Sequence, residues 1–162
     1  MHERPNISPC LLYVGTKDGV YVFYMEGDRL SLVGRGIEKN AVRGIAIHPN
    51  NPEIAYVGCC LGGWGLHYTK DAGKNWESLG FKDLWVWDVI IHPSDCKTIL
   101  VGTEPPMIYI SKDEGSTFKA CSSTKYYGNV KALEGITLSI KEGEIFTILG
   151  PNGAARQRFS YC

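Results

Sequence analysis

The chain has 162 residues, of which 44% are hydrophobic, and it carries 17 basic and 17 acidic residues. This composition favours a packed domain over disorder, and the even spread of both charges predicts neither nucleic acid nor an anionic membrane as partner. The start, Met1 to Asn6, lacks the features of a signal peptide, and no stretch approaches the ~18 apolar residues that cross a bilayer. We therefore expect a cytoplasmic protein.

The six cysteines include the adjacent pair Cys59-Cys60, and none of them forms a CxxC motif. This spacing favours reduced or incidental thiols over a zinc site or a disulfide framework. No metal ligand set is expected.

The first part of the chain contains three short runs typical of β-strands, at Leu11 to Gly15, Val20 to Tyr24 and Leu30 to Val33. An Asp18-Gly19 pair separates the first two runs, which indicates a tight hairpin. Two longer repeats follow, each with four such runs. They are Arg43 to His48, Ile54 to Gly58, Trp64 to Thr69 and Trp76 to Leu79, and then Trp87 to His92, Thr98 to Gly102, Ile108 to Ser111 and Phe118 to Cys121.

Landmarks of the two longer repeats keep a nearly constant distance. Ile47-His48-Pro49 recurs as Ile91-His92-Pro93 after 91 − 47 = 44 residues, and Tyr56-Val57-Gly58 recurs as Leu100-Val101-Gly102, again after 44. Short strands that repeat every ~40–45 residues are typical of β-propeller blades. We therefore predict an all-β fold over residues 1–121, an incomplete propeller with two full four-stranded blades and one partial blade at its start.

Two turn motifs share a hydroxyl, an acid, a glycine and an aromatic, 111 − 69 = 42 residues apart. They are Thr69, Asp71, Gly73 and Trp76, and Ser111, Asp113, Gly115 and Phe118. The motifs resemble the Asp-box, or BNR repeat, of sialidases and sortilin-like receptors. Physically, the acid can accept N–H bonds across the turn, the glycine allows positive φ, and the aromatic folds under the turn. We interpret each box as a structural clasp of a hairpin.

Several of these residues are of types that could also have a functional role. The box acids could be catalytic or bind calcium, but an isolated Asp offers too few oxygens for calcium, and the resemblance places the box on the rim away from an active site. His48 and His92 occupy equivalent positions, which favours a framework role. Trp85-Val86-Trp87 could line a sugar site, although strand core is the preferred interpretation. Sialidase activity is not expected, because too few arginines are present before residue 122.

After Cys121 the period stops, and residues 122–162 form a second predicted domain. Residues 125–154 resemble the opening of an ABC transporter ATP-binding subunit, with Tyr127 as the adenine-stacking aromatic and strands at Ile136 to Ile140 and Glu144 to Leu149. The resemblance implies a phosphate loop that begins at Gly150-Pro151-Asn152-Gly153. This domain is predicted as a truncated, β-rich stub.

The phosphate loop departs from its pattern at Ala155, Arg156 and Gln157, where glycine, lysine and a hydroxyl residue belong. Loss of one G from GCG GGC AAG ACA ACG would convert Ala-Gly-Lys-Thr-Thr into Ala-Ala-Arg-Gln-Arg, as at Ala154 to Arg158. We therefore hypothesise a frameshifted ABC sequence joined to propeller repeats.

The sequence predicts a non-catalytic propeller module that binds or scaffolds a protein or carbohydrate partner, with no cofactor. The alternative is an ATP-binding fragment of an ABC transporter ATPase, for which ATP and Mg²⁺ would be the cofactors and membrane transporter subunits the partners. An incomplete propeller would expose strand edges, so marginal stability and aggregation are expected. The third interpretation is that the chain has no selected function.

Overall fold

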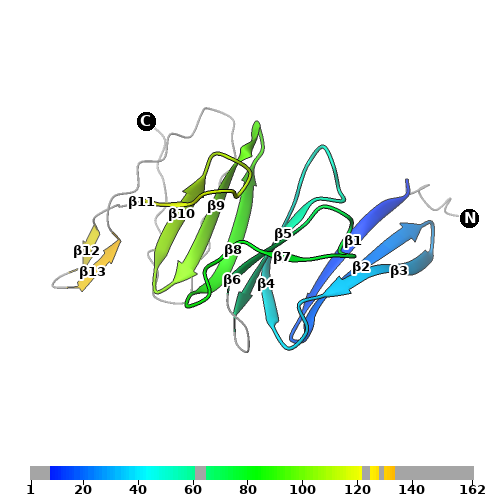
Figure 1. The fold of residues 1–162 in the computed structure, drawn as a ribbon, viewed down its shortest axis with the longest axis horizontal. Coiled ribbons are helices and arrows are strands. Elements are labelled where there is room, and N and C mark those ends of the chain that lie inside the picture. Colours follow the sequence, from blue (N-terminus) through cyan, green and yellow to red (C-terminus); the bar gives the residue numbers. More distant parts are fainter. Residues whose placement is uncertain (1–7, 61–64, 122–124, 128–129, 134–162) are drawn as a thin grey trace, which may run out of the picture.

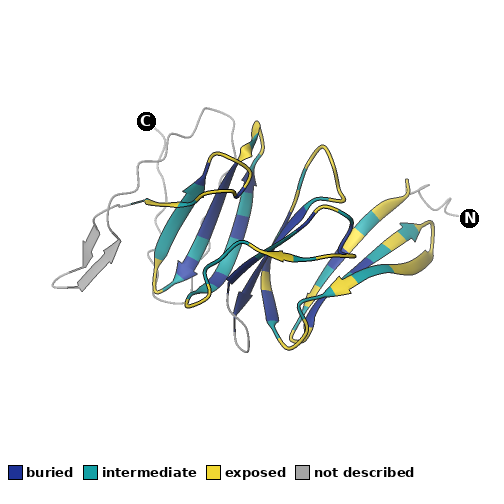
Figure 2. Ribbon diagram, viewed as in Figure 1, coloured by how far each residue is buried: buried dark blue, intermediate teal, exposed yellow. Residues whose placement is uncertain are grey.

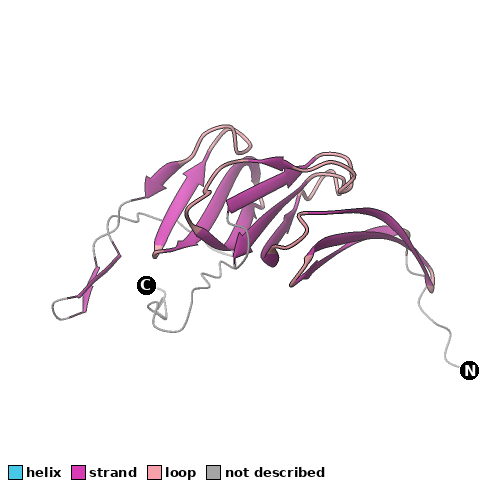
Figure 3. Ribbon diagram, turned by 60° about the horizontal axis from the view of Figure 1, so that its bottom comes forward, coloured by secondary structure: helices cyan, strands magenta, loops and turns pink. Residues whose placement is uncertain are grey.

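The computed structural model describes residues 8–60, 65–121, 125–127 and 130–133, and every regular element in these ranges is a β-strand (Figures 1 and 3). The strands are β1 (Cys10–Thr16), β2 (Gly19–Glu26), β3 (Arg29–Gly36), β4 (Ala41–Ile47), β5 (Ala55–Cys60), β6 (Gly65–Thr69), β7 (Glu77–Ser78), β8 (Trp85–His92), β9 (Asp95–Glu104), β10 (Met107–Ser111), β11 (Lys119–Cys121), β12 (Lys125–Tyr127) and β13 (Val130–Leu133).

The strands form three antiparallel sheets that follow one another along the chain. Sheet 1 has the order β1-β2-β3, sheet 2 the order β4-β5-β6-β7, and sheet 3 the order β8-β9-β10-β11. The sheets lie side by side in the order of the chain (Figure 1). β12 and β13 pair with each other in a separate two-stranded sheet. Each strand follows its neighbour through a short connection, which is why the pairing is antiparallel throughout.

The strand positions match the expectation from the sequence closely. All eleven runs expected before residue 122 contain a strand, and sheet 1 has three strands where the two later sheets have four. Tyr13-Val14-Gly15 of β1 precedes Tyr56-Val57-Gly58 of β5 by 56 − 13 = 43 residues, so β1 corresponds to β5 and β9. It is therefore the innermost strand that has no counterpart among the described residues of sheet 1. The strands expected at Ile136 to Ile140 and Glu144 to Leu149 lie outside the described residues.

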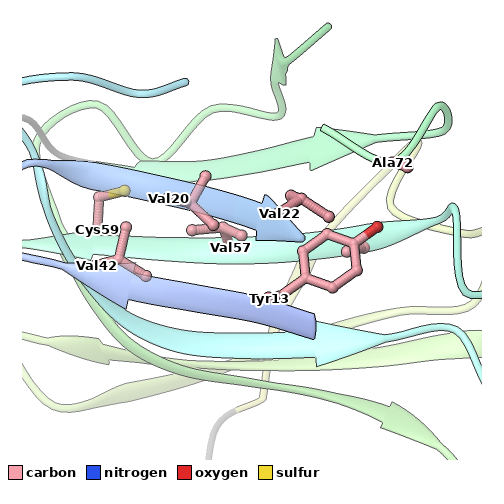
Figure 4. Close-up of a cluster of buried hydrophobic side chains, with 8 residues drawn as sticks. Tyr13, Val20, Val22, Val42, Val57, Cys59 and Ala72 are labelled. Carbon is pink, nitrogen blue, oxygen red and sulfur yellow. The ribbon is translucent and has the colours of Figure 1, made fainter. Parts of the chain in front are cut away.

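Two buried clusters lie between the sheets rather than within any one of them. Buried residues occur on strands of all three sheets (Figure 2). The first joins sheets 1 and 2 and consists of Tyr13, Val20, Val22, Val42, Ala55, Val57, Cys59 and Ala72 (Figure 4). The second joins sheets 2 and 3 and consists of Ala46, Tyr56, Leu66, Val86, Val89, Ile91, Ile99 and Val101. Sheet 2 is therefore buried on both faces, and its strand β5 is buried at every position.

Close packing between sheets depends on glycines that bring one backbone against the next. A Cβ atom on Gly34 of β3 would lie 2.2 Å from the carbonyl oxygen of Ala72, and one on Gly36 would lie 2.4 Å from Cδ1 of Trp76. Real Cβ atoms do not approach other atoms this closely, so these positions admit only glycine without a shift. The first Asp-box therefore rests directly on the outer strand of sheet 1. Among the described residues, no helix is long and apolar enough to span a membrane.

Candidate functional site

One contact between two sheets combines charged and aromatic side chains, and residues at corresponding bulges of the inner strands build it. The register of β4 against β5 shifts between Val42 and Gly44, and that of β8 against β9 shifts between Val86 and Asp88. Arg43 and Trp87 are the residues at these shifts, and they are 87 − 43 = 44 residues apart. A bulge turns the side chain of its extra residue away from the regular alternation, a device that recurs beside functional sites.

Arg43 and Trp87 contact each other across the two sheets. The guanidinium carbon of Arg43 lies 5.6 Å from the centroid of the Trp87 ring, in the range of a cation–π contact. The Nε of Arg43 donates to Sγ of Cys60 at 3.4 Å, and Nε1 of Trp87 donates to Oε2 of Glu104 at 2.9 Å. The ring of Trp85 meets that of Trp87 edge to face, with centroids 6.0 Å apart. We call these five residues the Trp87 cluster.

The charged and aromatic members of the Trp87 cluster lie outside the core, whereas Cys60 is fully buried. Trp85 and Trp87 are half-buried, Arg43 is exposed, and none of the three belongs to either buried cluster. Of the segment Trp85-Val86-Trp87, the interpretation as strand core holds only for Val86, which is fully buried. Charged groups and aromatic rings at one edge of the two sheets can supply both stacking and hydrogen bonds to a bound molecule.

Asp88, next to Trp87 in β8, has a distinct environment. Burial raises the pKa of its carboxyl group, while a hydrogen bond from the Val89 amide at 2.9 Å acts in the opposite direction. The register places Asp88 opposite Gly102 of β9. A half-buried acid at this inner position has no counterpart in sheet 2, where Gly44 stands at the same point of the repeat.

The first Asp-box closes its turn through hydrogen bonds to one hydroxyl and one carboxylate. The Thr69 hydroxyl donates to Oδ1 of Asp71 at 2.9 Å and accepts from the Gly73 amide at 3.0 Å. Asp71 also accepts from the backbone and the side-chain amide of Asn75, at 2.9 and 2.6 Å. Gly73 has φ 78°, and the indole of Trp76 donates to its carbonyl at 3.1 Å.

The second Asp-box repeats this geometry. The Ser111 hydroxyl donates to Oδ1 of Asp113 at 2.7 Å and accepts from the Gly115 amide at 2.8 Å. Asp113 accepts from the backbone and the hydroxyl of Thr117, at 2.9 and 2.6 Å. Gly115 has φ 88°, and Phe118 packs against the second buried cluster. Hydrogen bonds from the side chains of Thr117 and Ser111 hold the pKa of Asp113 at about 2.

The two boxes lie at the opposite end of the sheets from the Trp87 cluster. In β8 and β9, Trp85 pairs with Glu104 at one end and His92 with Asp95 at the other. The second box docks at the latter end, because the Glu114 amide donates to the Lys97 carbonyl at 3.0 Å. The side-chain hydrogen bonds of both acids stay within their own turns, so the geometry gives the boxes a role in holding hairpins.

His48 and His92 also serve turns. Nδ1 of His48 accepts from the Asn50 amide at 3.2 Å, and Nδ1 of His92 accepts from the amides of Ser94 and Asp95, each at 3.2 Å. Within the described residues, no group of three or more His, Cys, Asp or Glu side chains could hold a metal ion. The expected nucleotide-site residues Gly150, Pro151, Asn152 and Gly153 lie outside the described residues, as does the side chain of Tyr127.

Sequence reasoning did not assign Arg43, Cys60 or Glu104 to a site. The signal that could have found the pair Arg43 and Trp87 is their equivalence in the 44-residue repeat. This equivalence becomes informative only when the bulges are known, because the bulges decide the direction in which these two side chains point. Glu104 is found only through the register that sets β9 beside Trp87.

Comparison with solved structures shows that the three sheets resemble blades of GH74 propellers. An ancestral GH74 enzyme matches with a TM-score of 0.57 and 16% identity, over 74% of this chain and 17% of the enzyme. The GH74 enzyme of Niastella koreensis matches with a TM-score of 0.51 and 22% identity, over 72% of this chain and 21% of the enzyme. These likenesses show the fold of the repeats. No family model matches the chain.

Comparison with curated proteins finds two different kinds of relative. A probable oligoxyloglucan-reducing end-specific xyloglucanase of Neosartorya fischeri is 35% identical over 62 residues, which are 38% of this chain and 8% of that protein. The zinc import ATP-binding protein ZnuC of Anaplasma phagocytophilum is 51% identical over 35 residues, 22% of this chain and 14% of that protein. An ABC transporter ATP-binding protein of Escherichia coli, YdcT, is 42% identical over 33 residues, 20% of this chain and 10% of that protein. The chain thus spans a small part of each relative.

Proposed function

We propose that the propeller sheets act as a non-catalytic binding module and that the Trp87 cluster binds a neutral oligosaccharide. The observation that carries this proposal is the half-buried indole of Trp87, which contacts the guanidinium of Arg43, the carboxylate of Glu104 and the ring of Trp85 at the edge of two sheets. A pyranose ring presents an apolar face to an aromatic ring and hydroxyl groups around its rim. Stacking on an indole and hydrogen bonds to Arg43 and Glu104 would satisfy both.

The side chains of Trp87 and Arg43 are also held in place in the absence of a ligand. Glu104 fixes the indole of Trp87 through its Nε1, and Arg43 is fixed at its other side by Cys60, which is fully buried. Preorganised side chains lose less conformational freedom on binding. The xyloglucanase named among the relatives motivates the choice of a xyloglucan oligosaccharide as the first ligand to test.

The test is calorimetric titration of the full chain with a xyloglucan heptasaccharide. The proposal predicts saturable binding that falls at least ~10-fold in Trp87→Ala and in Arg43→Ala, a loss expected when a binding hot spot is truncated. Lys70→Ala provides the matched control, because Lys70 is exposed beside the first Asp-box at the other end of sheet 2. Equal binding by wild type and both cluster variants would overturn the proposal.

A second candidate function rests on the ATP-binding relatives, which match short stretches of the chain. Under this alternative the chain retains a partial nucleotide site around Tyr127 and Gly150 to Gly153. Titration with a fluorescent ATP analogue tests it: saturable binding that is lost in Tyr127→Ala supports the alternative, and no binding argues against it.

A further inference from the structure

Each sheet turns one face toward the next sheet along the chain, and we call this its leading face. Glycines at corresponding positions of the repeats lie on this face. A Cβ atom on Gly15 would lie 2.6 Å from Cγ1 of Val42, and one on Gly58 would lie 2.5 Å from Cγ1 of Val86. The equivalent Gly102 in sheet 3 has no atom of the described residues within 4 Å of such a Cβ. The leading face of sheet 3 therefore repeats a docking surface that no described sheet covers.

Side chains opposite these glycines show the same difference. Val20 pairs with Gly15 and Leu66 with Gly58, and both side chains are fully buried by the following sheet. Ile108 pairs with Gly102 in the same register but is only half-buried. On the leading face of sheet 3, Ile108 and Ile110 are thus only half-buried, whereas Leu100 on the same face is buried.

The opposite, or trailing, face of sheet 1 is also apolar and uncovered. Val57 and Val101 on the trailing faces of sheets 2 and 3 are fully buried, whereas the equivalent Val14 of sheet 1 is only half-buried. The neighbouring Leu12 and Leu32 on this face are 41% and 53% exposed. Sheet 1 holds four of the five large hydrophobic side chains that are exposed in the described residues, namely Leu12, Tyr24, Leu30 and Leu32. Such a concentration of apolar surface marks an interaction site.

Asp88 indicates what kind of sheet can cover the leading face of sheet 3. At the equivalent point of sheet 2, a Cβ on Gly44 would lie 2.8 Å from Cα of Asp88, because the inner strand of the next sheet passes there. In sheet 3 this position is Asp88 itself, so its side chain would collide with the inner strand of any four-stranded sheet docked in the same way. Sheet 1, as described, has no inner strand beside β1 and leaves that space open.

We propose that the leading face of sheet 3 binds the trailing face of sheet 1 of a second copy of this chain. The contact continues the packing already seen between sheets 1 and 2 and between sheets 2 and 3, and it buries both uncovered apolar faces. Because the two surfaces differ, the association is heterologous, and each copy keeps one free face of each kind until a ring closes or a filament grows.

The test uses two variants that each retain one face. Leu12→Asp with Leu32→Asp charges the trailing face of sheet 1, and Ile108→Asp with Ile110→Asp charges the leading face of sheet 3. We expect wild type to exceed the 17.9 kDa of one chain in sedimentation equilibrium. Each variant alone should associate at least ~10-fold more weakly, while an equimolar mixture should form a complex of two chains. Association of either variant by itself at the wild-type affinity, or no complex in the mixture, would overturn the proposal.

A second measurement leaves the partly buried isoleucines intact and so does not depend on the folding of that variant. A photo-crosslinking amino acid in place of Leu32, which is exposed, should label peptides of β9 to β11 in a second copy. Labelling of sheet 1 peptides would indicate a symmetric contact between like faces and contradict the heterologous interface. A wild-type chain that stays monomeric and forms no crosslink would also contradict it.

Discussion

The hydroxyl group of Tyr56 in sheet 2 donates a hydrogen bond to the carbonyl oxygen of Glu114 in the second Asp-box, at 2.9 Å. The equivalent Tyr13 of sheet 1 donates to the carbonyl of Pro52 in sheet 2 at 2.8 Å. Burial raises the pKa of both tyrosines, that of Tyr13 to about 12, so both hydroxyl groups remain protonated donors at neutral pH. Sheets 1 and 2 therefore each bind a turn region of the following sheet through one buried tyrosine hydroxyl.

Tyr56→Phe should lower the free energy of unfolding by about 1 kcal/mol, because it removes a hydrogen bond and leaves the Glu114 carbonyl without its donor. Urea denaturation followed by tryptophan fluorescence measures the change. Tyr24→Phe is the matched control, since Tyr24 is 39% exposed, and it should change stability by less than ~0.5 kcal/mol. Equal effects of the two substitutions would show that the contact between sheets contributes nothing.

Gly58→Ala should destabilise the chain by ~1–3 kcal/mol through overpacking, because the new methyl group would meet Val86 of the next sheet. Gly102→Ala makes the same chemical change at the equivalent position of sheet 3, where no described atom lies within 4 Å. Below the concentration at which copies associate, we expect Gly102→Ala to leave stability nearly unchanged. Thermal unfolding of both variants side by side checks this difference, and equal losses would contradict the account of packing.

The Asp-boxes should make stability depend on pH in the acid range. Hydrogen bonds from Asn75 hold the pKa of Asp71 at about 2, and those from Thr117 and Ser111 do the same for Asp113, below the ordinary value of 3.8. Because the folded-state pKa is depressed, this stabilisation is fully present above ~4 and is lost as the pH falls through ~2.

The double variant Asp71→Asn, Asp113→Asn should therefore unfold at a lower temperature than wild type at pH 7. The difference should shrink between about pH 4 and pH 2, where the wild-type carboxylates become protonated. Circular dichroism melting curves across this range give the comparison. A constant difference between the two proteins at every pH would mean that the carboxylates contribute through shape rather than charge.

Restoring the phosphate-loop residues should not create an ATPase. The triple substitution Ala155→Gly, Arg156→Lys and Gln157→Thr supplies the glycine, lysine and hydroxyl of the motif, but catalysis also needs acidic and switch residues beyond this loop. Phosphate release by the variant should equal that of a blank. Measurable, Mg²⁺-dependent turnover would contradict this prediction.

Much of the fold could be predicted because its signals are local. The Asp18-Gly19 hairpin and the two boxes each specify a turn through residues close together in the chain. The 44-residue spacing of the repeat landmarks then indicates that the strands form repeated sheets. The missing strand of sheet 1 is the innermost one, and the sequence indicates its absence only through the number of strand-like runs, which is three in the first part of the chain and four in each later repeat.

The Trp87 cluster could not be predicted because its contacts join residues far apart in the chain. Whether Trp87 faces the core or solvent depends on a one-residue bulge, and such a shift moves a side chain to the other face of a strand. Arg43 reaches Trp87 only because sheets 2 and 3 pack through Gly44 and Gly58. The sequence also does not reveal that Glu104 would fix the indole, because that bond depends on the register of β9.

Titration of the uniformly ¹⁵N-labelled chain with a xyloglucan heptasaccharide, observed at the indole N–H signals, tests the proposed binding site most directly. The Trp76 indole, bonded to Gly73 at the far end of sheet 2, serves as an internal reference within the same spectrum. The account predicts saturable shifts of the Trp85 and Trp87 signals and a stationary Trp76 signal. Absence of shifts at Trp85 and Trp87, or equal shifts of all three, would contradict it.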